Sequence, residues 1–204
     1  MLNESPYRPG VLMAFRWMTL LVACAAQMVA QSGGNQKCKE LREGATATAA
    51  LAYLSGERDV LNSGCITRAL YIIGRAGYKP AAPTLIGYLD FEDPAILAGS
   101  KMVRQGGVYP AEAALESLGA SSVPYLKRAI ANEAETNILR RANAAATLFF
   151  VAENKPEALA FIIEKAHGSQ DAEMAKALIG VVGKLLRFCR PKDANECQYV
   201  WASR

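Results

Sequence analysis

The chain is poor in the residue types that most often carry out chemistry. It contains 1 histidine, 5 cysteines and 2 tryptophans among 204 residues. The lone histidine, His167, is followed directly by a glycine, a pattern that predicts the last turn of a helix, where the helix dipole favours a cation. No serine or cysteine forms a recognisable catalytic motif with it, and the cysteines lack the short spacing of zinc ligands. We therefore expect no catalytic residue, no metal ligand and no cofactor.

The chain also lacks a large excess of charge of one sign. Its 23 basic and 19 acidic residues give a formal net charge of +4, and no long run of like charges occurs. A protein that binds nucleic acid usually carries a basic patch or stripe to meet the phosphates. We therefore expect no nucleic-acid partner.

The apolar run near the start of the chain, 17–30, is too short to span a membrane comfortably. Arg8 and Arg16 precede it, and small residues stand at its end. A basic segment, a short apolar stretch and small residues together predict an export signal. We assign the signal to residues 1–30, cleaved after Ala26 or Ala30, and a flexible leader to 31–37. We expect the protein in the periplasm or outside the cell, and we expect no membrane contact beyond this signal segment or a lipid anchor.

Two other interpretations of this segment stay open. Residues 21–24 read Leu-Val-Ala-Cys, which resembles a bacterial lipobox. On that interpretation Cys24 becomes a lipid-modified N-terminus and the protein is anchored to a membrane through it. The third interpretation is an uncleaved anchor or a buried helix.

Cysteine usage agrees with export. Once Cys24 is set aside, four cysteines remain, and an even number is typical of an oxidising compartment. Cys189 and Cys197 flank a turn-rich segment, which favours a bridge between them, and Cys38 then pairs with Cys65 by elimination. This second pairing has one geometric difficulty. If a helix over 39–54 runs antiparallel to a helix over 65–76, Cys38 and Cys65 lie at opposite ends of the helix pair, unless the connection at 55–64 runs back along the helix. The alternative is a set of free, buried cysteines.

Self-similarity is the strongest feature that the sequence does have. The segments 69–89, 111–130 and 144–163 each show a helical apolar pattern, a short break and a second helical pattern. Ala82–Leu85 matches Val123–Leu126, 41 positions further on, and the next interval is 35 positions. Helix pairs that recur at this period predict units that shield one another's apolar faces by stacking in a row.

The first copy carries a recognisable signature. Residues 74–85 read Gly-Arg-Ala-Gly-Tyr-Lys-Pro-Ala-Ala-Pro-Thr-Leu, which resembles the consensus of HEAT repeats, in particular the bacterial PBS lyase HEAT-like group. The resemblance implies an all-α fold, a short right-handed α-solenoid of stacked antiparallel helix pairs. We assign this domain to 38–188. Residues 189–204 are assigned to a C-terminal cap, in which Tyr199, Val200 and Trp201 cover the end of a last helix over 171–187.

Individual residues of the motif have structural explanations. Glycine inside a helix costs about 1 kcal/mol relative to alanine, so Gly74 predicts a close approach between two helices. Gly77 can adopt the left-handed conformation that ends a helix. The third copy has Glu153 and Leu159 in place of the turn glycine and the proline, and Thr136 is the expected cap of its first helix.

The resemblance also suggests where a partner would bind. The second helix of each pair lines the concave surface in HEAT-like stacks, which places Thr84, Tyr88, Tyr125 and Arg128 on the exposed side. Tyrosine and arginine are favoured in protein interfaces. A glycine-flanked insertion over 99–110 adds three further candidates, Lys101, Arg104 and Tyr109. The acids that follow the first repeat, Asp90, Glu92 and Asp93, are expected to form a solvated turn.

The sequence therefore predicts an exported, non-catalytic helical-repeat scaffold that binds a protein or a peptide. An alternative is an enzyme on the same scaffold, because some HEAT-like proteins are bilin lyases or modify nucleic acids. The export signal, the small net charge and the missing catalytic motif all argue against that alternative.

Overall fold

In the residues that it describes, the computed structural model is helical apart from one short hairpin near the C-terminus. It describes residues 38–39, 41, 44–94 and 108–186, and the backbone alone of 187, 189–193 and 196–199. The predicted export signal (1–30), Cys24 within it and the leader (31–37) lie outside the described residues. The all-helical character predicted for the repeat domain is confirmed in its described part.

The helices are α2 (Ala47–Leu54), α3 (Ser63–Ala76), α4 (Ala82–Ile86), α6 (Pro110–Leu118), α7 (Val123–Ala131), α8 (Ile138–Val151), α9 (Lys155–Gly168) and α10 (Ala172–Arg187). Short 3₁₀ turns, η1 (Arg58–Val60), η2 (Lys79–Ala81) and η3 (Gly119–Ser122), stand in the connections. The strands β1 (Cys189–Asp193) and β2 (Glu196–Tyr199) form the hairpin.

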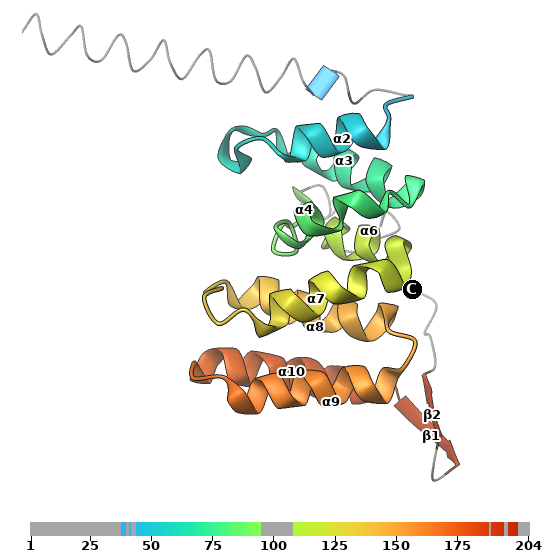
Figure 1. The fold of residues 1–204 in the computed structure, drawn as a ribbon, viewed down its shortest axis with the longest axis vertical. Coiled ribbons are helices and arrows are strands. Elements are labelled where there is room, and N and C mark those ends of the chain that lie inside the picture. The colour runs from blue at the N-terminus through green and yellow to red at the C-terminus, as the bar shows by residue number, and fades with distance from the viewer. Residues whose placement is uncertain are drawn as a thin grey trace, which may run out of the picture.

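The helices are arranged in two layers. In the first layer α3, α6, α8 and α10 contact one another in chain order, and in the second layer α4, α7 and α9 do the same. Each second-layer helix also packs against a first-layer helix, as α7 does on α8 and α9 on α10, while α2 packs on α3 at the N-terminal end. Figure 1 shows the pairs following one another along the long axis. A continuous apolar core lies between the layers.

The close helix–helix approach predicted at Gly74 is confirmed. A Cβ atom added to Gly74 in α3 would lie 2.9 Å from the Cα of Ala114 in α6, nearer than non-bonded carbon atoms normally approach. Gly77 ends α3 with φ of 58° and ψ of 35°, the left-handed conformation expected of it. Glycine is therefore required once for packing, at Gly74, and once for the turn that ends α3, at Gly77.

The segment 144–163 departs from the segments 69–89 and 111–130 at its second helix. The turns η2 and η3 precede α4 and α7, whereas α9 runs without a break from Lys155. In this segment Glu153 and Leu159 replace the turn glycine and the proline of the first copy. The side chain of Asn154 caps α9 by accepting a hydrogen bond from the Glu157 N–H. The predicted cap of α8 was wrong by one residue, because the side chain of Asn137, not Thr136, accepts a hydrogen bond from the Arg140 N–H at 3.0 Å.

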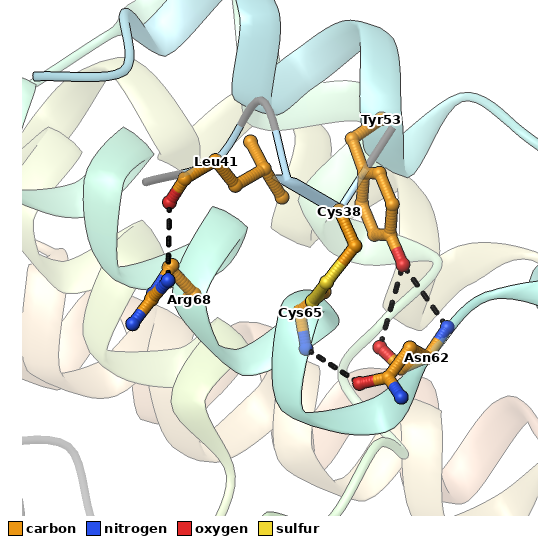
Figure 2. Close-up of a disulfide and its surroundings, with 6 residues drawn as sticks. All are labelled: Cys38, Leu41, Tyr53, Asn62, Cys65 and Arg68. Carbon is orange, nitrogen blue, oxygen red and sulfur yellow. Dashed lines mark hydrogen bonds between the residues drawn. A yellow bond between two sulfur atoms is a disulfide. The ribbon is translucent and has the colours of Figure 1, made fainter. Parts of the chain in front are cut away.

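A disulfide joins Cys38 to Cys65, with a Cα–Cα distance of 5.7 Å. Figure 2 shows Leu41 beside this bridge, with its carbonyl facing Arg68. The expected helix over 39–54 was wrong: α2 begins only at Ala47, capped by Thr46. The shorter helix leaves Cys38 and the buried Leu41 lying over the start of α3, which removes the geometric difficulty of this pairing.

The segment assigned to a C-terminal cap contains a hairpin over 189–199. β1 and β2 pair antiparallel, with Cys189 opposite Tyr199 and Cys197 opposite Pro191. The two cysteine-bearing segments therefore lie side by side, two positions out of direct register. Their side chains lie outside the described part of the structure, and the predicted Cys189–Cys197 bridge stays a prediction.

Candidate partner-binding surface

A groove opens on the second layer, between α4 and α7. It has a volume of about 560 Å³ and is lined by Pro83, Ile86, Tyr125, Arg128, Ala129, Ala131 and Asn132. The two helices also contact each other. Most of the lining is apolar, and Arg128 is the one charged side chain among these described residues. We call this feature the α4–α7 groove.

The groove exists because α7 is amphipathic. Leu126 and Ile130 point into the core and are fully buried. Tyr125 and Arg128 come from the opposite side of the helix, Tyr125 half-buried and Arg128 exposed. The structure thus brings these two predicted partner-binding residues into one groove. Thr84 is half-buried on α4 and is not part of the lining.

Tyr88 was expected on the exposed face, and that expectation was wrong. The residue is only 4% exposed, and its hydroxyl donates a hydrogen bond to the Leu54 carbonyl at 2.7 Å. The sequence pattern predicted an exposed Tyr88 because it assumed that the helix continues. In the structure α4 ends at Ile86 and the chain then turns inward. The Arg58 guanidinium lies 5.3 Å from the Tyr88 ring centroid. Burial raises the pKa of the Tyr88 hydroxyl, although the charge of Arg58 acts in the opposite direction.

The structure describes only residues 108–110 of the insertion over 99–110, and none of these three lines the groove. Lys101 and Arg104 lie outside the described residues. Tyr109 precedes α6, in the first layer, and its hydroxyl donates a hydrogen bond to Glu92 Oε1 at 3.0 Å. Tyr109 therefore does not line the same surface as Tyr125 and Arg128.

The acids after α4 do not form a solvated turn, and the expectation that they would was wrong. Asp93 is buried, and its N–H donates to the Val108 carbonyl at 2.9 Å. Asp90 accepts hydrogen bonds from Arg58 Nη1 at 2.9 Å, from Arg140 Nη2 at 3.2 Å and from Asn137 Nδ2 at 2.8 Å. These partners come from η1 and from the start of α8. Asp90 therefore ties three turns together at one edge of the molecule.

The electrostatics of this cluster favour the charged carboxylate. Burial alone would raise the pKa of Asp90, but the hydrogen bond from Arg58 and the charge of Arg140 outweigh it and lower the pKa. Glu135 completes the cluster, with its carboxylate 2.8 Å from Arg140 Nη1. Two cations and two anions balance, so these four side chains carry no net charge.

A second feature lies between α7 and α9 and was missed from the sequence. The amines of Lys127 and Lys165 lie 5.4 and 5.5 Å from the ring centroid of Phe161. Lys127 also pairs with Glu157 at 3.0 Å, which links α7 to α9. The four-residue spacing of Phe161 and Lys165 could have indicated part of this cluster. The contribution of Lys127 could not be foreseen, because it depends on how the two helices pack.

The described residues contain no group of three or more side chains arranged to hold a metal ion. His167 is exposed in the last turn of α9, as predicted. No helix in the described part of the chain is long and apolar enough to cross a membrane.

A further acid with a strongly raised pKa lies in the first layer. Glu112, in the first turn of α6, has its pKa raised to about 7, first by burial and then by the charge of Glu116. Burial raises the pKa of Glu116 as well, although the charge of Lys155 acts against this. The Lys155 amine and the Tyr109 hydroxyl are the titratable groups that interact with these two acids, and we assign the group no chemistry.

In comparisons with known proteins, the chain matches no family model, no curated protein and no solved structure.

Proposed function

We propose that this protein is an exported, non-catalytic helical-repeat scaffold that binds an extended segment of a protein or a peptide in the α4–α7 groove. The observation that carries the proposal is the composition of the groove. An apolar floor, a half-buried tyrosine and an exposed arginine lie together on one face. Apolar surface with tyrosine and arginine is the combination that contributes most to protein interfaces.

The proposal includes the finer description of the fold, a short right-handed α-solenoid of HEAT type. Its support is the order of contacts within each layer and the tight packing of Gly74 against Ala114. A row of pairs gives an extended surface whose length can accommodate an extended chain. The α4–α7 groove lies where consecutive repeats meet, which is where such a chain would cross from one repeat to the next.

The groove is held rigidly from below, which favours binding. Leu85 and Leu126 fix α4 and α7 in the core, and both are fully buried. Tyr88 and Asp90 anchor the chain after α4 through hydrogen bonds to α2, η1 and α8. A surface that is already ordered loses less conformational entropy when it binds.

Export and location belong to the same proposal. The Cys38–Cys65 disulfide is compatible with an oxidising compartment. We place the protein in the periplasm or outside the cell, with Cys24 as a lipid-anchor candidate and no nucleic-acid partner. The N-terminal residue of the mature protein, read by mass spectrometry, tests this part independently of binding.

The binding proposal can be tested without knowing the natural partner. A displayed library of random peptides is selected on the purified protein, and the enriched peptides are measured by fluorescence polarisation. The test variant is Tyr125→Ala with Arg128→Ala. The matched control is Tyr71→Ala with Arg75→Ala, which removes an exposed tyrosine and an exposed arginine from α3 in the first layer.

We expect the groove variant to weaken peptide binding at least tenfold, because truncating such anchors typically costs 1 kcal/mol or more each. The control variant should bind as the unmodified protein does. The proposal fails if the selection enriches no peptide, or if both variants lose affinity equally.

A further inference from the structure

A second hollow lies on the other side of α7 from the α4–α7 groove. It has a volume of about 280 Å³ and lies between α7 and the start of α9. Small apolar side chains, among them Val123, Ala152 and Ala158, line it together with charged ones. Figure 1 shows α7 between α4 and α9 along the long axis. We call this feature the α7–α9 hollow.

The groove and the hollow carry opposite charges. Arg128 is the charged residue that lines the α4–α7 groove, which gives that lining a net charge of +1. The charged residues that line the α7–α9 hollow are Lys127, Glu153 and Glu157, so one amine and two carboxylates give a net charge of −1. A surface that changes sign across one helix suits a chain that carries both signs. It does not suit the phosphate backbone of a nucleic acid, which needs cations throughout.

Charge of each sign is accessible to a partner. Arg128 and Glu153 are exposed, and neither forms an ion pair with another residue in the described part of the chain. Glu157 pairs with Lys127 at 3.0 Å, yet its side chain stays 63% exposed. Its carboxylate therefore keeps the capacity to accept a further hydrogen bond. An exposed cation thus stands on one side of α7, and exposed carboxylates stand on the other.

We propose that the bound segment crosses α7 and occupies both features, with an acidic side chain at Arg128 and a basic side chain in the α7–α9 hollow. This inference rests on the function proposed above and adds the chemical class of the partner. The aliphatic stem of a lysine or arginine would lie against the small apolar residues of the hollow. Its cation would meet the carboxylates of Glu153 and Glu157.

The geometry of α7 sets the spacing of the two charges in the partner. Neighbouring packed helices are about 8–10 Å apart, and features that flank the same helix are separated by roughly one such distance. An extended chain advances about 3.3 Å per residue. The acidic and basic residues are therefore expected three or four positions apart. Pro124 and Arg128, which are exposed on α7 at a four-residue spacing, mark the ridge that the chain crosses.

The probes for the test are the peptides that a random displayed library yields on the unmodified protein, measured by fluorescence polarisation. We expect these peptides to carry an acidic and a basic residue at the stated spacing. Glu153→Lys reverses the charge of the hollow and should weaken their binding about fivefold. Replacing the basic residue of the peptide with glutamate should restore binding to this variant. Glu133→Lys, in the turn after α7, makes the same charge change at an exposed residue that lines neither feature, and should leave the affinity unchanged.

The two proposals fail in different ways. If Tyr125→Ala with Arg128→Ala weakens binding but Glu153→Lys does not, the groove binds the peptide and the crossing of α7 is wrong. Equal losses in Glu153→Lys and Glu133→Lys, with no recovery by the reversed peptide, also overturn the crossing. If the library yields no peptide, both proposals are wrong. A dimer in sedimentation that the peptides dissociate would make a second copy the occupant and would overturn the peptide assignment.

Discussion

Asp90 and Arg140 are 50 residues apart in the chain, yet Arg140 Nη2 lies 3.2 Å from Asp90 Oδ1. The same carboxylate accepts a hydrogen bond from Arg58 at 2.9 Å. One acid from the turn after α4 thus holds both the turn η1 and the first turn of α8. The loss of this acid would remove the carboxylate that pairs with Arg58 and leave Arg140 paired with Glu135 alone.

We predict that Asp90→Asn destabilises the protein by about 2 kcal/mol, because removing one partner of a largely buried ion pair leaves the others uncompensated. Chemical denaturation monitored by circular dichroism measures the change. Asp59→Asn is the control, since Asp59 is exposed on η1, and it should change the free energy of unfolding by less than about 0.5 kcal/mol. Equal effects of the two substitutions would show that the cluster contributes nothing.

Asp90 also makes the free energy of unfolding depend on pH in the acidic range. Its pKa is lowered in the folded state from an ordinary value of 3.8. The stabilisation is therefore complete above pH 3.8 and is lost as the pH falls through the lower folded-state value. Unfolding midpoints in urea, measured from pH 5 downward, should decline more steeply in the unmodified protein than in Asp90→Asn. Parallel declines would contradict the assignment.

Glu112 gives the free energy of unfolding the opposite dependence on pH. Its pKa is raised from 4.5 to about 7, so the folded state holds the proton more tightly than the unfolded chain does. Stability from this group is present below pH 4.5 and is lost as the pH rises to about 7. Glu116 and Lys155 are the charged groups that act on this site.

We therefore predict that Glu112→Gln raises the melting temperature at pH 8 more than at pH 5, because glutamine stays neutral at both. Glu57→Gln, at an exposed position before η1, is the control and should show no such difference. A gain from Glu112→Gln that is the same at both pH values would show that the carboxyl group does not titrate in this range.

Local features of the fold could be predicted from the sequence at positions that only one residue type can occupy. Gly74 predicted a close helix contact and Gly77 a helix stop, because few other residues fit either place. Tyr88 and Asp90 could not be placed, because their positions depend on where α4 ends and on turns distant in the chain. The α4–α7 groove was foreseen only in Tyr125 and Arg128, which belong to a regular amphipathic helix.

We predict that Gly74→Ala destabilises the protein by about 1–3 kcal/mol, because its Cβ would press on the α6 backbone at Ala114. Gly168→Ala is the matched control, since a Cβ there would have no heavy atom within 4 Å, and we expect it to be neutral or slightly stabilising. Urea denaturation gives both values. A stabilising effect of Gly74→Ala would mean that α3 and α6 are not in tight contact.

The Cys38–Cys65 bridge closes a loop with a sequence separation of 27, for which chain entropy predicts a stabilisation of about 3.5 kcal/mol. The double variant Cys38→Ser with Cys65→Ser should lose about this much. Dithiothreitol should destabilise the unmodified protein and leave the double variant unaffected. Peptide mapping without reduction that shows Cys38 free or paired with another cysteine would contradict the assignment.

The most direct test of the proposed function is the footprint of a selected peptide in hydrogen–deuterium exchange. Our account predicts that the bound peptide slows exchange in 83–89 and 123–132, the segments that form the α4–α7 groove, and leaves the outer side of α3 unchanged. Slowed exchange confined to the first layer, or none at saturating peptide, would contradict the claim that this groove is the binding site.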